Sequence, residues 1–157
     1  MKITLLLIGA TDKKFLKEGV EDYLKRVTFY LPFESKIIPD IRNNRNLTRD
    51  QQKEREGKAI LDSVAPGDEL FLLDEKGKEL SSSQFAQWIE KRMISGSRQI
   101  VFVIGGPYGF SPEVYARSNG LLSLSKMTFP HQLVRLIFAE QLYRALTIIK
   151  GEPYHHE

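Results

Sequence analysis

Short apolar runs alternate with amphipathic stretches along the whole chain. The runs at residues 3–8 and 99–104 carry few polar side chains, as strands of a parallel sheet do when helices cover both of its faces. Between such runs, apolar residues recur three and four positions apart, which is the spacing of one helix face. This alternation predicts an α/β fold with a mainly parallel sheet flanked by helices. At 157 residues, the chain fits a single domain spanning 1–157.

Local signals place the individual elements. We expect strands at 2–9, 35–39, 68–74, 99–104 and 121–125, and the longest helix at 131–149. Lys76-Gly77 is expected to turn the chain after the third strand. Side chains that can cap the first turns of four helices stand at Asp12, Thr48, Ser81 and Ser111.

Composition excludes several classes of site. The chain contains no cysteine, which rules out a disulfide scaffold, a thiol nucleophile and a cysteine-ligated zinc ion. The apolar run at 3–10 is far shorter than the ~20 residues of a membrane-spanning helix, and no signal-peptide cleavage pattern follows it. A chain without cysteine and without such a segment is expected to be cytoplasmic, with no membrane contact. Because it has only three histidines, we also expect no bound metal.

A glycine-rich loop, Gly105-Gly106-Pro107, follows directly after the 99–104 run. Ligands of open α/β sheets bind at the carboxyl ends of strands, and glycine lets a backbone approach a ligand closely. The loop lacks the Gly-Lys-Ser/Thr of a phosphate-binding P-loop and the spaced glycines of a dinucleotide site. A small-molecule site and a simple tight turn both remain open.

Residues 123–131 join the last predicted strand to the long helix. Hydroxyls mix there with apolar side chains, as an adenosine pocket would require, although an ordinary connection could look the same. The helix that follows is apolar over most of its circumference, so it is either central or covered by another subunit. Arg135 and Arg144 interrupt it, and each needs a ligand or an ionic partner such as Glu140.

In their order and spacing, these pieces resemble the ribosomal RNA large subunit methyltransferase H family of the SPOUT superfamily. The resemblance covers essentially the whole chain. It rests on Leu72-Leu73-Asp74, Ile104-Gly105-Gly106-Pro107, Leu122-Ser123-Leu124-Ser125, Thr128-Phe129-Pro130-His131, Leu133-Val134-Arg135, residues 139–145 and Pro153-Tyr154-His155. It implies S-adenosylmethionine-dependent methylation of N3 of a pseudouridine in helix 69 of 23S ribosomal RNA, on assembled ribosomes.

The resemblance also implies a knot, a partner and a cofactor site. The C-terminal part would be threaded through a trefoil knot, giving a SPOUT-type α/β knot, and the protein would act as a homodimer. Carried over by position, S-adenosylmethionine would contact Leu73, Gly105, Leu124, Ser125, Lys126, Met127, Thr128 and Phe129.

The expected catalytic residues lie near the C-terminus. The N3 proton must pass to a group within hydrogen-bond reach, because the neutral base has no free lone pair on N3. Our hypothesis is that the tail, ordered over a dimer-related site, supplies His155 or Glu157, with Tyr154 positioning the base. Arg144 or Arg135 would hold a phosphate or the developing oxyanion.

The formal charge is +3, and the excess of lysine and arginine lies in the first 60 residues. A basic cluster there would dock ribosomal RNA through its phosphates, although a solvated helix face with offsetting acids is an equal alternative. Its members are Arg42, Arg45, Arg49, Lys53 and Lys58. In the tail, His156 stands where the family has arginine, so a phosphate contact there would need this histidine to be protonated.

Two other function classes remain open. One is a nucleotide-binding α/β protein that uses the Gly105-Gly106 loop for another adenosine-containing ligand. The other is a non-catalytic, ribosome-associated RNA-binding module with the same fold. Selective binding of S-adenosylmethionine over ATP and NAD would separate the methyltransferase from the first alternative.

Overall fold

The computed structural model describes residues 1–39 and 46–156. In this part of the chain, five strands form one sheet in the order β2-β1-β4-β3-β5, and all neighbouring strands are parallel. The predicted α/β class is therefore confirmed, while threading through a knot stays a prediction. The elements are β1 (Lys2–Ile8), α1 (Lys14–Val27), β2 (Phe33–Ile38), α2 (Arg49–Asp62), β3 (Glu69–Glu79), α3 (Ser82–Ile94), β4 (Gln99–Ile104), α4 (Pro112–Arg117), β5 (Gly120–Ser123) and α5 (His131–Ile149).

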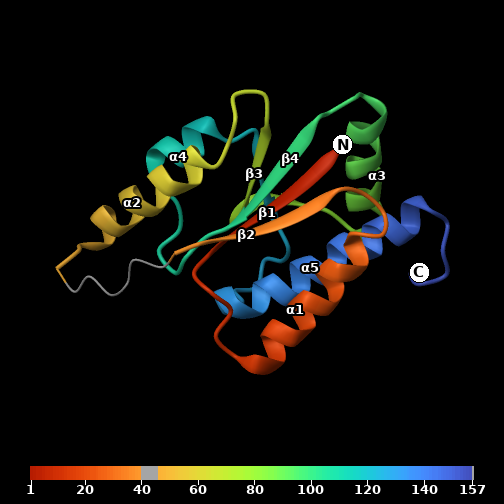
Figure 1. Cartoon of the computed structure of the whole chain (residues 1–157), viewed down its shortest axis with the longest axis horizontal. Helices are drawn as coiled ribbons and strands as arrows, with labels where there is room; N and C mark the ends of the chain where they lie inside the picture. The colour runs from red at the N-terminus through yellow and green to blue at the C-terminus, as the bar shows by residue number, and fades with distance from the viewer. Residues whose placement is uncertain (40–45, 157) are drawn as a thin grey trace.

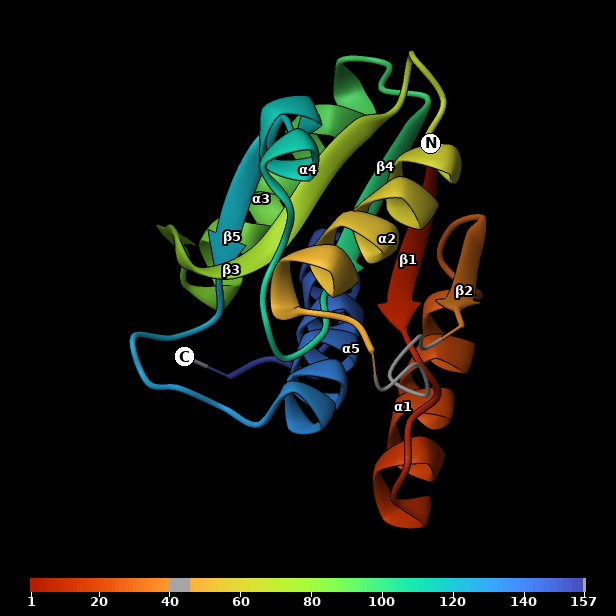
Figure 2. The ribbon, with the colours of Figure 1, turned by 90° about the vertical axis from the view of Figure 1, so that its left-hand side faces the viewer.

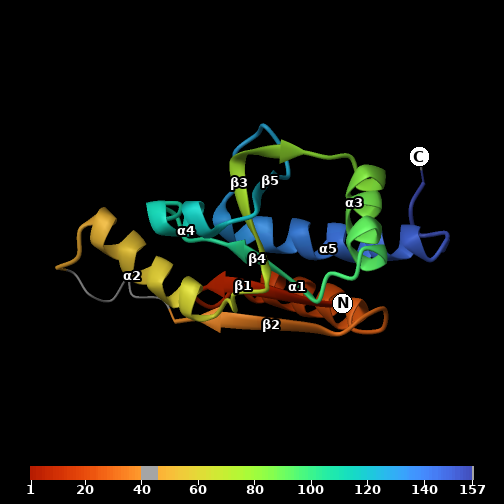
Figure 3. The ribbon, with the colours of Figure 1, turned by 90° about the horizontal axis from the view of Figure 1, so that it is seen from above.

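Helices cover both faces of the sheet (Figure 1, Figure 3). On one face α1, α3 and α5 share an apolar core with the strands, and on the other face α2 and α4 do so. Helices α2 and α4 lie side by side (Figure 2). Along β1, Ile3 and Leu5 enter the first core while Leu6 and Ile8 enter the second, because successive side chains of a strand point to opposite faces. No helix in the described ranges is long and apolar enough to cross a membrane.

Three of the four predicted helix caps are confirmed. Thr48, Ser81 and Ser111 each accept a hydrogen bond from the first turn of the helix that follows. The prediction that Asp12 caps α1 was wrong, because α1 begins without any side-chain cap. The backbone N–H of Asp12 donates instead to Gln132 Oε1 of α5, at 3.0 Å. A contact distant in sequence has replaced the local one.

The third strand does not end at Asp74 as predicted, because β3 continues to Glu79. The chain still bends within β3, near the predicted turn at Lys76-Gly77 (Figure 3), and β3 pairs with β5 on both sides of this irregularity in the register. Gly77 lies against the backbone of β5, where a Cβ would stand 2.6 Å from the carbonyl carbon of Leu121. The irregularity brings residues 74–76 to the edge of a cavity at the end of the sheet.

A buried arginine ties α5 to the end of β1. Arg135 is fully buried, and its Nη2 donates to Ile8 O at 2.6 Å while its Nη1 donates to Gly9 O at 2.8 Å. Nη1 also lies 3.1 Å from Thr11 Oγ1. The expectation that Arg135 holds a phosphate or oxyanion is therefore wrong, because main-chain carbonyls occupy its guanidinium. Glu140, its expected ionic partner, pairs with Arg144 instead.

Candidate functional site

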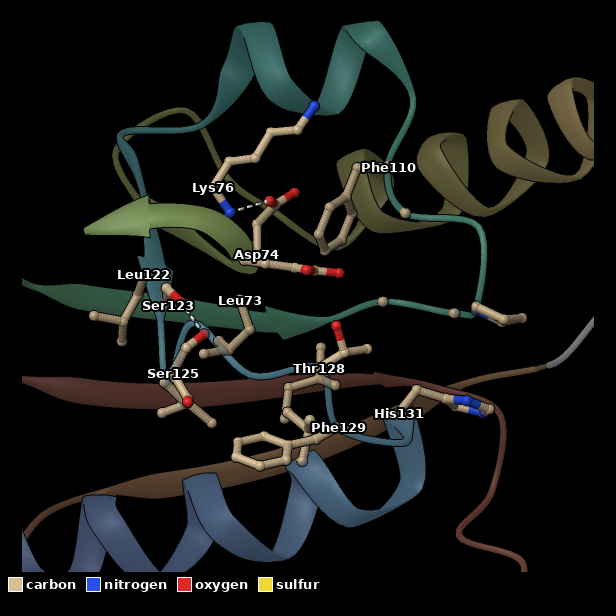
Figure 4. A pocket seen from close by; sticks show the side chains of 18 of the residues that line it. Leu73, Asp74, Lys76, Phe110, Leu122, Ser123, Ser125, Thr128, Phe129 and His131 are labelled. Atoms are coloured by element: carbon tan, nitrogen blue, oxygen red, sulfur yellow. Dashed lines mark hydrogen bonds between the residues drawn. The ribbon is translucent and has the colours of Figure 1, made fainter. Parts of the chain in front are cut away.

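A cavity of about 750 Å³ lies at the carboxyl ends of β3, β4 and β5. Three segments line it, at 73–76, 104–110 and 122–134. The cavity thus joins the glycine-rich loop to the 123–131 connection, which the sequence had marked as separate candidates. Figure 4 shows Phe110 on one side of the cavity and Phe129 on the other, with Leu73 between them. A cleft of this size, at this end of a parallel sheet, is suited to a small-molecule ligand.

Most residues predicted to bind the methyl donor line this cavity. They are Leu73, Gly105, Leu124, Ser125, Met127, Thr128 and Phe129. Lys126 belongs to the same loop but is exposed and does not line the cavity. The sequence did not single out Asp74 or Phe110 as site residues, although both line the cavity. Asp74 could have been found, because it stands where the third strand of the predicted sheet ends.

The loop after β5 is braced by its own hydroxyls. Ser123 Oγ donates to Ser125 O at 2.9 Å, and Met127 N donates to Ser125 Oγ at 3.0 Å. These bonds use the side chains to fix the course of the backbone. A loop fixed in this way presents the polar groups of its main chain to the cavity in a set geometry.

The C-terminal tail folds back onto α5. Tyr154 donates to Glu140 Oε1 at 2.9 Å, and Arg144 donates to the same oxygen at 2.6 Å from Nη2. Arg144 Nη1 lies 3.1 Å from His155 Nδ1. Because a guanidinium can only donate, Nδ1 of His155 accepts, and the neutral ring carries its proton on Nε2. Three expected catalytic residues, Arg144, Tyr154 and His155, therefore form one cluster; the fourth, Glu157, lies outside the described residues.

Charge and burial keep two members of this tail cluster, Tyr154 and Arg144, protonated. Burial, together with hydrogen bonds to Tyr23 and Glu140, raises the pKa of Tyr154, so its hydroxyl remains a donor. The hydrogen bonds that Arg144 donates to Glu140 raise the pKa of Arg144 above its already high usual value. Tyr154 and Arg144 therefore offer hydrogen-bond donors and positive charge, and neither can accept a proton from a substrate.

Helix α5 separates the cavity from the tail cluster. His131 at its first turn lines the cavity, whereas Arg144 lies 13 residues further along, which is roughly 20 Å at 1.5 Å per residue. The C-terminal end of the chain lies at the far end of α5 (Figure 1, Figure 3). Among the described residues, none of the tail lines the cavity.

The predicted basic cluster is only partly described. Arg42 and Arg45 lie outside the described residues. On α2, the Arg49 guanidinium lies 5.0 Å from the centre of the Tyr108 ring, and Lys53 Nζ lies 3.8 Å from Asp50. Lys58 is exposed. Within the described segments, no group of histidines and carboxylates has an arrangement that could hold a metal ion.

A clasp between β3 and α4 closes one side of the cavity. The Tyr115 hydroxyl donates to Asp74 Oδ2 at 2.5 Å, and Lys76 N donates to Asp74 Oδ1 at 2.9 Å. The Tyr115 ring also meets Phe110 edge to face, with centres 5.8 Å apart. Burial, with the hydrogen bond to Asp74 next, raises the pKa of Tyr115 to about 12.

We predict that Tyr115→Phe changes how stability depends on pH. An unfolded tyrosine has a pKa of about 10, so between pH 10 and 12 the folded wild type holds a proton that the unfolded chain has lost. The stability contributed by Tyr115 is fully present below pH 10 and is lost as the pH rises toward 12. In urea titrations, the variant should lose about 1 kcal/mol at pH 7 and should decline less steeply than the wild type above pH 10. Equal slopes in the two proteins would contradict this role.

Comparison with known proteins agrees with this geometry. A family model described as "Predicted SPOUT methyltransferase" matches residues 1–155. A protein of Parabacteroides distasonis and one of Flavobacterium psychrophilum are each 55% identical to this chain over 157 residues, covering all of both sequences. A protein of Bacteroides fragilis is 48% identical over the same length. All three are named ribosomal RNA large subunit methyltransferase H. The recognition made from the sequence is thereby confirmed, and this chain belongs to the SPOUT methyltransferase family.

Proposed function

We propose that this protein uses S-adenosylmethionine to methylate N3 of a pseudouridine in helix 69 of 23S ribosomal RNA, on assembled ribosomes in the cytoplasm. The observation that carries the proposal is the cavity at the ends of β3, β4 and β5. It gathers seven of the eight positions that the family resemblance assigns to the methyl donor. The relatives' shared name supplies the substrate class, ribosomal RNA of the large subunit.

The residues of the cavity fit such a donor. Leu73, Leu124 and Phe129 offer apolar surface for an adenine ring, and the braced loop at 123–127 offers backbone groups for its polar edge. Carboxylates of Asp74 and Glu75 lie among the lining residues and suit a ligand with positively charged sulfonium and amino groups. When bound, S-adenosylmethionine supplies a methyl group that is already activated by its sulfonium.

We propose that a second copy of the chain completes the site. The tail cluster lies too far along α5 to reach the cavity of its own chain, so a homodimer must bring it there. Helix α5 supports this arrangement with apolar side chains that are only half-buried in one copy, among them Leu133, Ile137 and Ile149. A second copy packed against α5 would cover them.

Different residues of the tail cluster would then have different roles in removing the N3 proton. His155 donates from Nε2 as long as Arg144 holds its Nδ1, so we assign it to a carbonyl oxygen of the base. The one hydroxyl proton of Tyr154 is donated to Glu140, so we assign Tyr154 to positioning the base through its ring. Arg144, aligned by Glu140, would stabilise the negative charge that develops as the proton leaves. Glu157 is the acceptor that we propose for the proton; His155 would accept it only after its tautomer changed.

Isothermal titration of the purified protein with S-adenosylmethionine is the first test. We expect selective binding, with no comparable heat from ATP or NAD. Ribosomes that lack the methyl group should then be methylated at the pseudouridine by the same preparation. Tight binding of ATP or NAD would favour another nucleotide-binding protein. Binding of ribosomes without methyl transfer would favour an RNA-binding module.

Gly105→Ala tests whether the cavity is the donor site. A Cβ at position 105 would stand 2.9 Å from Phe110 Cε1, so the Phe110 ring or the loop itself, both part of the cavity lining, must shift. We expect affinity for S-adenosylmethionine to fall by about tenfold or more, measured by titration. Gly67→Ala is the matched control, because a Cβ at Gly67 meets nothing within 4 Å. Equal affinities in the two variants would remove the cavity from the proposal.

Tail variants test the proposed roles of His155 and Glu157. In single-turnover methylation of ribosomes, Glu157→Ala should lower the rate by about 10²-fold or more, as expected when a general base is lost. His155→Ala should also lower the rate, while both variants keep wild-type affinity for S-adenosylmethionine. Lys150→Ala, exposed at the end of α5, serves as the control. Near-normal rates in both tail variants would contradict the proposed mechanism.

A further inference from the structure

We infer that Glu56, on α2, is a positioning residue for residues 105–109, called here the glycine wall of the cavity. Through this wall, Glu56 sets the affinity of the cavity for its positively charged methyl donor. The inference rests on the proposed function, because it concerns the same cavity. It adds a residue that lies behind the wall and does not line the cavity.

The glycine wall depends on what packs behind it. It is an irregular segment between β4 and α4, with Gly109 at a φ of 80°. Its turn closes with a long hydrogen bond of 3.4 Å, from Gly109 N to Gly106 O. One side of the wall faces the cavity, where Phe110 packs over Gly105. A segment with such weak internal bonding takes its position from its neighbours.

Helix α2 supplies the support on the other side. At its first turn, Arg49 stacks 5.0 Å from the centre of the Tyr108 ring. Further along, Gly57 lies so close to Ser111 that a Cβ on Gly57 would clash with Ser111 Oγ. This close approach, which any side chain at position 57 would prevent, brings the adjacent Glu56 against the wall.

The carboxylate of Glu56 and the backbone of Gly106 limit each other's position. Glu56 is 4% exposed, and both of its oxygens lie 3.3 Å from the place that a Cβ on Gly106 would occupy. Gln52, also buried, donates from Nε2 to Glu56 Oε1 at 3.1 Å and orients the carboxylate. A buried carboxylate is costly unless such bonds hold it, so this arrangement tolerates little displacement. The same carboxyl group lies behind a wall whose other side faces the cavity proposed for a positively charged ligand.

A purely structural role for Glu56 makes different predictions. If Glu56 only fastened α2 to the rest of the fold, its loss would lower the melting temperature without changing the wall or the ligand affinity. Ile60 offers the matched comparison. It lies one turn further along α2, is 1% exposed, and belongs to the core beneath the helix without lining the cavity.

The test compares Glu56→Ala, Glu56→Gln and Ile60→Val with the full-length wild type. For Glu56→Ala, we expect affinity for S-adenosylmethionine to fall about tenfold by titration, and amide hydrogen exchange at residues 105–109 to accelerate without ligand. Glu56→Gln keeps the shape and an acceptor for Gln52, so it should restore slow exchange. Its affinity should fall more for S-adenosylmethionine than for S-adenosylhomocysteine, which lacks the sulfonium charge. Ile60→Val should melt earlier but keep wild-type affinity and exchange.

Two results would overturn the inference. One is wild-type affinity together with wild-type exchange at 105–109 in Glu56→Ala. The other is an equal loss of affinity in Ile60→Val, which would trace the effect to general loosening of α2. If the wild type itself bound neither S-adenosylmethionine nor S-adenosylhomocysteine, the proposed function would fail with the affinity claim. The exchange rates would then still decide whether Glu56 holds the wall.

Discussion

The buried guanidinium of Arg135 is the interaction on which the site depends. It donates to the carbonyl oxygens of Ile8 and Gly9, just where β1 ends. Hydrogen bonds of a charged group are worth about 1.5–3 kcal/mol each, and removing the donor would leave buried carbonyls unsatisfied. Arg135 thereby fixes the first turns of α5 beside the sheet edge. His131 and Val134, which line the cavity, take their places from the same turns.

The sequence predicted the local part of this fold well. Bounds of β4 and α5 follow from apolar periodicity alone, and Thr48 and Ser81 cap their helices as their spacing indicates. Both loops that line the cavity were also marked, because each follows a buried strand. These features depend on residues a few positions apart, and short-range patterns record them directly.

The errors share one physical cause, which is a partner distant in the chain. Asp12 does not cap α1, because the helix begins at Lys14 and Lys13 holds the N-cap position; the backbone of Asp12 contacts Gln132, 120 residues away. Arg135 was assigned to a ligand or to Glu140, because its actual partners are main-chain carbonyl oxygens, which the identity of the side chains does not reveal. Lys76-Gly77 was predicted to follow the end of the third strand, but β3 continues past it because residues 78–79 pair with β5. Glu56 reads as one more charge on an exposed helix until the packing of α2 buries it.

Helix α5 also explains why one chain is not enough for the proposed reaction. His131 in its first turn lines the cavity, and Arg144 near its other end contacts His155, so the helix keeps the cavity and the Arg144–His155 pair apart within each copy. In the proposed reaction, a single chain can bind the methyl donor, whereas removal of the N3 proton needs the tail of a second copy. An association that brings two α5 helices together would cover their apolar sides and assemble the two halves of the site in one step. In such a dimer, α5 would gain stability from the contact and would also determine where and when methyl transfer is possible.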